Sequence, residues 1–120
     1  MLNAAFIVLV VAGLFGSGLA VPYLREGPAP PWPIGAAHGL IALTGLALLA
    51  LTLRGPPRGV AQGIGSFGAI AAVLLALAAL AGLVQFALRL RRRRLPGALL
   101  GAHATLAIGG FIILLVYVLG

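Results

Sequence analysis

Two histidines occupy matching positions in an otherwise apolar chain: His38 in GAAHGLIALTG and His103 in LGAHATLAIGG. Imidazole binds metal ions through a neutral ring nitrogen and changes its charge near neutral pH. An ionisable side chain inside an apolar membrane segment is costly and indicates function by default. Ligation of a cofactor by histidine is therefore the first chemistry to consider.

Each histidine is followed by the same stripe of residues. A shift of 65 positions superimposes the two segments at +4, +7 and +11 from the histidine, which are positions on one face of a helix. The aligned pairs are Ala42 with Ala107, Gly45 with Gly110, and Leu49 with Leu114. Alanine and glycine leave little side-chain bulk for about two turns, roughly 10 Å, beside each imidazole. We expect a flat cofactor to lie there, in contact with Ala42, Gly45, Ala107 and Gly110.

The composition places these segments in a lipid bilayer. The chain has 120 residues, of which 62% are hydrophobic, whereas soluble domains have about 45–50% apolar residues. It contains no cysteine, which excludes disulfides, thioether-linked haem and iron–sulfur clusters held by this chain.

Four apolar segments meet the length of about 20 residues that a membrane-spanning helix needs. They are Leu2–Leu24, Pro33–Leu53, Gln62–Leu88 and Gly97–Leu119, separated by short segments rich in proline, glycine and arginine. Short connections favour antiparallel neighbours. We predict an all-α fold, in which residues 1–120 form a single transmembrane four-helix domain, an up-down-up-down bundle.

The bundle is predicted to consist of two duplicated helical hairpins, about residues 1–56 and 60–120. A shift of 64 positions relates the first segment to the third and matches Gly18 with Gly82 and Arg25 with Arg89. Because each half crosses the membrane twice, the halves have the same orientation and are related by an axis along the membrane normal. We assign the glycines outside the histidine stripe, among them Gly16 and Gly82, to close helix packing.

The arginines predict the orientation. Six of them lie in the first and third loops and two in the second, so the first and third loops are expected in the cytoplasm and both termini outside. Bacterial inner membrane is the expected location. Arg25 and Arg89 lie where haem propionates would emerge, and a role as topology anchors is equally open. The arginine run lacks interleaved aromatic residues, so we expect no nucleic-acid partner.

The second and fourth helices of such a bundle are diagonal and parallel, so His38 and His103 can face each other at equal depth. Two axial imidazoles without any thiol favour one non-covalent, six-coordinate b-type haem, with His38 and His103 as the metal ligands. A filled coordination sphere favours electron transfer over oxygen binding.

With these residues in place, the chain resembles the small four-helix b-type membrane cytochromes that exchange electrons with quinone. The resemblance covers all four helices and rests on a histidine followed by a small residue two turns later. It implies an electron carrier more than a stand-alone enzyme, with quinone, another membrane redox subunit or a second copy of the chain as partners. The chain departs from the commonest members, which hold two haems on four histidines.

Other readings stay open. The glycines can serve helix packing alone, and the histidines can hold a (bacterio)chlorophyll-type pigment or no cofactor in a small accessory subunit of a larger membrane complex. Gln85 can donate to a propionate or a quinone oxygen, or bond to a neighbouring helix. Glu26 is the only acidic residue and lies in a loop, which disfavours a proton- or cation-coupled transporter. No catalytic dyad or triad can be assembled from the residues present.

Overall fold

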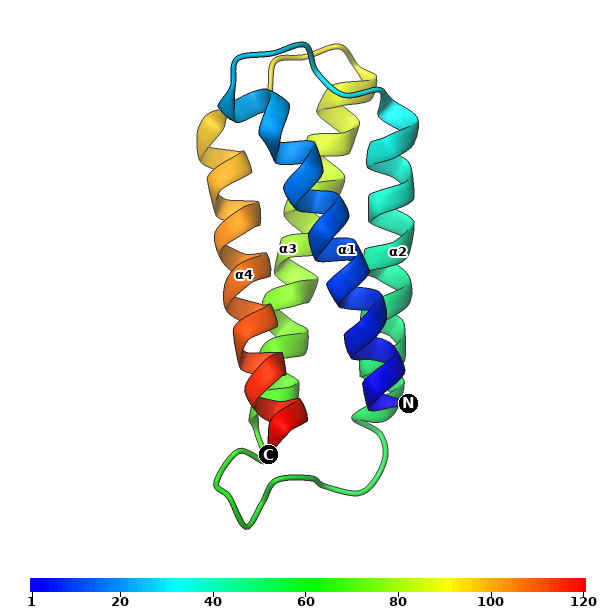
Figure 1. Ribbon diagram of the computed structural model, residues 1–120, viewed down its shortest axis with the longest axis vertical. Helices are drawn as coiled ribbons and strands as arrows, with labels where there is room; N and C mark the ends of the chain where they lie inside the picture. Colours follow the sequence, from blue (N-terminus) through cyan, green and yellow to red (C-terminus); the bar gives the residue numbers. More distant parts are fainter.

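The protein is a bundle of four long helices. A computed structural model describes all 120 residues, with α1 at Leu2–Leu24, α2 at Trp32–Thr52, α3 at Phe67–Leu90 and α4 at Gly97–Leu119. The molecule measures 48 × 22 × 19 Å. Figure 1 shows both termini at one end, together with the loop between α2 and α3, and the other two loops at the opposite end.

The predicted all-α fold of four helices is confirmed. Each helix is long and apolar enough to cross a membrane, and large apolar side chains cover the outer surface. In water such an apolar surface would promote aggregation, whereas the lipid of a bilayer solvates it. The chain is therefore an integral membrane protein in its architecture.

The third helix starts five residues later than the predicted Gln62. Residues 60–64 form a turn, in which Gly63 donates to the carbonyl of Val60 (3.1 Å) and Ile64 to that of Gly59 (2.9 Å). Gly59 and Gly63 have φ angles of +71° and +75°, a backbone conformation that glycine adopts without steric cost. These two glycines delay the helix although the segment is apolar enough to continue it.

Two helices end in the same capping structure. The N–H of Gly27 donates to the carbonyl of Pro22 (2.8 Å) and the N–H of Arg93 to that of Leu88 (2.9 Å), which is the closing bond of a Schellman motif. The residues at the left-handed position are Glu26 (φ 53°) and Arg92 (φ 52°). These matching ends of α1 and α3 lie 66 positions apart.

The inward faces follow one spacing in all four helices. Positions at intervals of four, three and four residues point into the bundle: Ala5, Leu9, Ala12 and Gly16 in α1, Ala71, Leu75, Ala78 and Gly82 in α3, and the stripes of His38 and His103 in α2 and α4. Where one helix of a hairpin carries a large side chain, its partner carries a small one. A Cβ atom on Gly45 would lie 2.7 Å from Cγ of Leu9, and one on Gly110 would lie 2.9 Å from Cγ of Leu75.

The buried core occupies only the half of the bundle near the termini. Leu49 and Leu114 are fully buried there in one cluster with Ala5 and Ala71, and Phe6 of α1 stacks on Phe111 of α4 with ring centroids 5.4 Å apart. On the other side of Ala12, Ala78, Gly45 and Gly110, toward the arginine-rich loops, no residue is buried. The half that contains the histidines is thus the less tightly filled one.

The contact of Gly45 with Leu9 leads to a test of this packing. Gly45→Leu places a side chain where Leu9 already lies, and we expect a loss of about 1–3 kcal/mol of stability because a well-filled core cannot accept the extra volume. The thermal unfolding midpoint in detergent micelles measures it. The matched control is Gly39→Leu, since a Cβ there has no neighbour within 4 Å. Equal midpoints for the two variants would contradict the packing described.

Candidate functional site: the paired histidines

The two histidines meet inside the bundle. Their ring centroids lie 6.2 Å apart with an angle of 82° between the ring planes. Both side chains are half-buried. They come from α2 and α4, so the structure brings together the two residues that the sequence singled out.

Each imidazole is held by a backbone carbonyl of its hairpin partner. Nδ1 of His38 lies 3.0 Å from the carbonyl oxygen of Ala12 in α1, and Nδ1 of His103 lies 2.8 Å from that of Ala78 in α3. A carbonyl oxygen only accepts hydrogen bonds, so Nδ1 donates and carries the proton. The lone pair of each neutral ring is therefore on Nε2, for which the protein supplies no hydrogen-bond partner.

Glycine makes these hydrogen bonds sterically possible. The carbonyls of Ala12 and Ala78 already accept the helical bonds from residues four positions later, and a second lone pair remains. A helical Cβ leans toward the N-terminus, so the side chain at i+4 lies over residue i. The residues at i+4 are Gly16 and Gly82. A Cβ on them would lie 3.0 and 3.1 Å from Cε1 of His38 and His103.

These contacts set the register of the repeat. Ala12 corresponds to Ala78 and Gly16 to Gly82, a shift of 66 positions instead of the predicted 64. The pairing of Gly18 with Gly82 was therefore wrong, and a Cβ on Gly18 would have no neighbour within 4 Å. The signal was present in the sequence, because the shift of 66 also aligns the inward Ala5 and Leu9 with Ala71 and Leu75.

The four small residues that were predicted to line a cofactor lie in two different surroundings. Ala42 and Ala107 are half-buried one turn below the histidines. Gly45 and Gly110 lie a further turn away and are buried, and leucine side chains fill the space beside them. Leu9 and Leu75 therefore form the floor of the region around the histidines.

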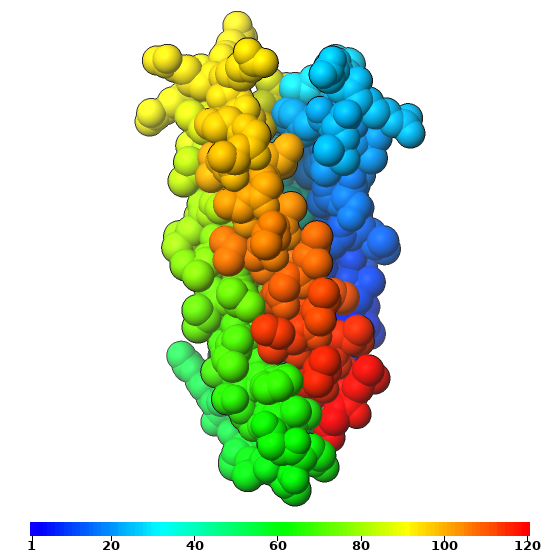
Figure 2. All heavy atoms as spheres, turned by 90° about the vertical axis from the view of Figure 1, so that its left-hand side faces the viewer, coloured from blue at the N-terminus to red at the C-terminus, as the bar shows by residue number.

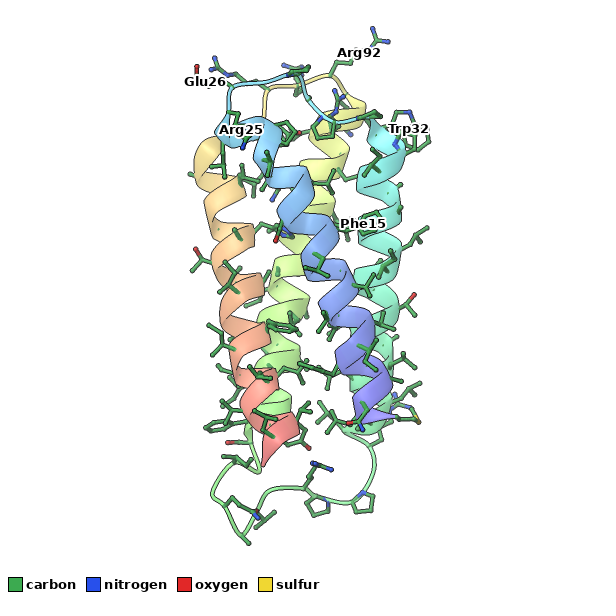
Figure 3. The ribbon with its side chains drawn as sticks, viewed as in Figure 1. Phe15, Arg25, Glu26, Trp32 and Arg92 are labelled. Atoms are coloured by element: carbon green, nitrogen blue, oxygen red, sulfur yellow. The ribbon has the colours of Figure 1, made fainter.

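The two predicted arginines differ in position. Arg89 is half-buried and its Nη2 donates to the carbonyl of Pro30 in the first loop, at 2.9 Å, while its Nε is buried without a hydrogen-bond partner. Arg25 is exposed at the end of α1, where Figure 3 shows it at the arginine-rich end of the bundle. In the register of 66, Arg89 corresponds to Tyr23 and Arg25 to Arg91.

A polar pair on α3 connects the histidines with the arginine-rich end. Gln85 and Arg89 continue the inward stripe of α3 beyond Gly82, at intervals of three and four residues. Nε2 of Gln85 donates to the carbonyl of Leu99 in α4 at 3.3 Å. The alternative that Gln85 bonds to a neighbouring helix is therefore the one observed, and its amide oxygen is left as a free acceptor.

An open apolar cleft lies between α1, the first loop and the start of α2. Its volume is about 540 Å³, and it is lined by Phe15, Gly18, Leu19, Pro22, Pro28, Ala29, Pro30, Pro31 and Ile34. Ile34 precedes His38 by one turn on the same face. Figure 3 shows Phe15 among the helices below the first loop.

Comparisons of the chain with protein-family models, with curated proteins and with solved structures find no match. The histidine geometry is therefore the feature that points to a function.

Gly16 and Gly82 provide a test of the carbonyl bonds. We expect Gly16→Leu to displace the His38 ring and Gly82→Leu to displace the His103 ring, each with a loss of about 1–3 kcal/mol for a polar group left without its partner. Nitrogen NMR of labelled histidine reports the loss directly, because the proton no longer stays on Nδ1. Gly18→Leu is the matched control two residues away, and the same spectral change in that variant would refute the role of Gly16.

Proposed function

We propose that the protein binds one non-covalent b-type haem between His38 and His103 and carries electrons near its arginine-rich end. The observation that supports this best is the state of the two imidazoles. Each has Nδ1 fixed by a carbonyl and Nε2 free, and the ring centroids lie 6.2 Å apart with nearly perpendicular planes. Histidine ligands of metals typically have their second nitrogen hydrogen-bonded to such an oxygen, which fixes the tautomer and the ring direction.

The distance between the rings agrees with a shared metal. Metal–imidazole bonds of about 2.0–2.1 Å place two opposed nitrogens about 4 Å apart and the ring centroids about 6 Å apart. The observed separation is 6.2 Å. Two histidines alone are too few ligands for a structural zinc, which takes four, whereas they complete the axial positions of a haem iron.

A macrocycle clamped between α2 and α4 would need room beside the histidines. The space over Gly16 and Gly82 is already taken by the imidazole rings, so the room would have to come from the loose packing of this half of the bundle, which lacks buried residues. We take Ala42 and Ala107 as the nearest ring contacts, with the leucines beside Gly45 and Gly110 as the limit of the space.

The charged edge of the cofactor fits the side of α3. Haem carries two carboxylates, and a guanidinium binds a carboxylate through two parallel hydrogen bonds. Arg89 presents a buried, unpartnered Nε seven residues from Gly82. Arg89 is therefore our choice for holding a propionate, in preference to the exposed Arg25.

A haem with two axial histidines supplies one-electron chemistry. The chain would hold the iron ligands in one tautomer, keep the macrocycle in an apolar setting and neutralise a propionate. The cleft beside Ile34 and Phe15 is apolar and open, which suits the ring of a membrane quinone as the exchange partner. The arginine distribution supports placing this end in the cytoplasm, with the bacterial inner membrane as the location.

The histidine clamp is tested by substitution. His38→Ala and His103→Ala should each abolish the low-spin haem spectrum, and the double variant should add little, because the two ligands act on one iron. The reduced-minus-oxidised spectrum and the ratio of haem to chain measure this, with one haem per chain expected.

Two results would contradict the clamp. A chromophore that absorbs to the red and is halved by each single variant would mean two separate pigments. A chain that is folded after expression with ample haem and binds none would mean an accessory subunit, in which the histidines serve only to join the helices.

The role of Arg89 has its own test. Arg89→Gln should lower the haem reduction potential and weaken haem retention, because a positive charge near the iron favours the reduced state and the propionate loses its partner. Arg25→Gln is the matched control, with an expected shift near zero because its charge is exposed. Redox titration of both variants measures the difference, and equal shifts would argue against a specific contact of Arg89.

A further inference from the structure

The arginine end of the molecule, defined as residues 25–31 and 91–96, carries an uncompensated positive charge. Six of the eight arginines belong to it or lie directly beside it, against the single acidic residue Glu26. Arg91–Arg94 are all exposed. Among the arginines only Arg58 and Arg89 donate side-chain hydrogen bonds to the protein, so the charge of Arg91–Arg94 faces outward.

The surface at this end consists of two lobes. Figure 2 shows the first and third loops as separate lobes with a notch between them. The lobe of Arg91–Arg94 is basic. The first loop carries the exposed Arg25 and Glu26, followed by exposed Pro28 and Pro31, and α2 begins after it with a Trp32 side chain that is 54% exposed. Figure 3 shows Arg92 extending beyond the end of the helices, away from the bundle.

The histidines lie close beneath this surface. His38 is six residues into α2 and His103 six residues into α4, so each is about 9 Å along its helix from the arginine end. The opposite end is separated from them by the filled leucine layers. A redox centre on the histidines would therefore exchange electrons with a protein most readily at the arginine end.

We propose that the arginine end is the docking surface for the acidic face of a soluble one-electron carrier protein. This inference rests on the haem function proposed above and adds its partner. Complementary charge raises the rate of encounter by 10–10³-fold, and the effect falls steeply with salt. Pro28, Pro31 and Trp32 beside the arginines supply the uncharged contact that such an interface has at its centre.

Anionic lipid is the other surface that such arginines can contact. Lipid contact accounts for a charge at the rim of a helix. Exposed arginines and a tryptophan at the helix ends suit the lipid interface as well. The nearness of the proposed redox centre, about 9 Å along the helices from this end, is what favours a protein partner, because lipid does not exchange electrons with it.

The experiment uses the haem-loaded chain in nanodiscs, which leave both faces accessible whatever the direction of insertion. A reduced acidic ferredoxin is the probe, and stopped-flow absorbance at low and high salt gives the second-order rate constant. The variant Arg91→Gln, Arg92→Gln, Arg93→Gln and Arg94→Gln should reduce the low-salt rate at least tenfold and flatten its salt dependence. Arg54→Gln with Arg58→Gln, at the opposite end, should leave both unchanged.

Further measurements show whether a slower ferredoxin reaction results from the lost charge or from damage to the redox site. An equal rate for a small neutral reductant in the wild type and the quadruple variant shows that the site itself is intact. Replacing all four of Arg91, Arg92, Arg93 and Arg94 by glutamate should slow the ferredoxin reaction further, because it removes twice as much positive charge as replacement by glutamine. The proposal is overturned if the ferredoxin rate is the same in the wild type and the quadruple variant, or if it depends on charge only when the disc contains anionic lipid.

Failure of the haem function is visible separately. The spectrum taken before mixing shows whether haem is bound at all. If no haem is bound, the salt-dependent binding of oxidised ferredoxin to the haem-free discs still tests the docking surface. Binding that is lost in the quadruple variant supports the proposed surface, and an absence of binding overturns it.

Discussion

An imidazole N–H inside a bilayer must find an acceptor within the protein, because lipid offers none. In this chain the acceptor is a helix carbonyl that glycine has left uncovered, once in each hairpin. That hydrogen bond fixes the tautomer of the histidine, its depth in the bundle and the register of the two helices it joins. The spacing of the remaining inward residues follows from this register, since a small residue of one helix then lies opposite a large residue of its partner.

The hydrogen bonds also explain how the bundle is divided. Both of them lie within a hairpin, and the closest helix packing is likewise between α1 and α2 and between α3 and α4. The two hairpins are joined by fewer direct interactions. Those observed include the histidine pair, the stacked Phe6 and Phe111, and the tilted contact of Trp32 with Phe86, whose ring centroids are 6.5 Å apart. Among neighbouring helices, α1 and α4 contact each other least.

The sequence was sufficient for the four helices and for the pairing of His38 with His103, because apolar length and a shared face are strong signals. It was insufficient where two patterns competed. At Gln62 the apolar composition favoured helix, whereas Gly59 and Gly63 favoured a turn. For α1 and α3 the isolated match of Gly18 with Gly82 concealed the better register of Ala12 with Ala78. The environment of Gly45 and Gly110 could not be predicted because a glycine stripe alone does not show whether leucine or a cofactor fills the space.

Within each hairpin the histidine has its hydrogen-bond acceptor, and a leucine packs against the inward glycine of the partner helix. This has a consequence for how the chain evolved. Two identical hairpins side by side, related by a twofold axis through the bilayer, would bring two copies of one histidine face to face at the same depth. A short ancestral peptide with a single histidine could therefore have formed this site as a homodimer, before duplication and fusion joined the two copies. In that case the copies diverged after fusion, and one such difference is arginine at position 89 where its counterpart is Tyr23.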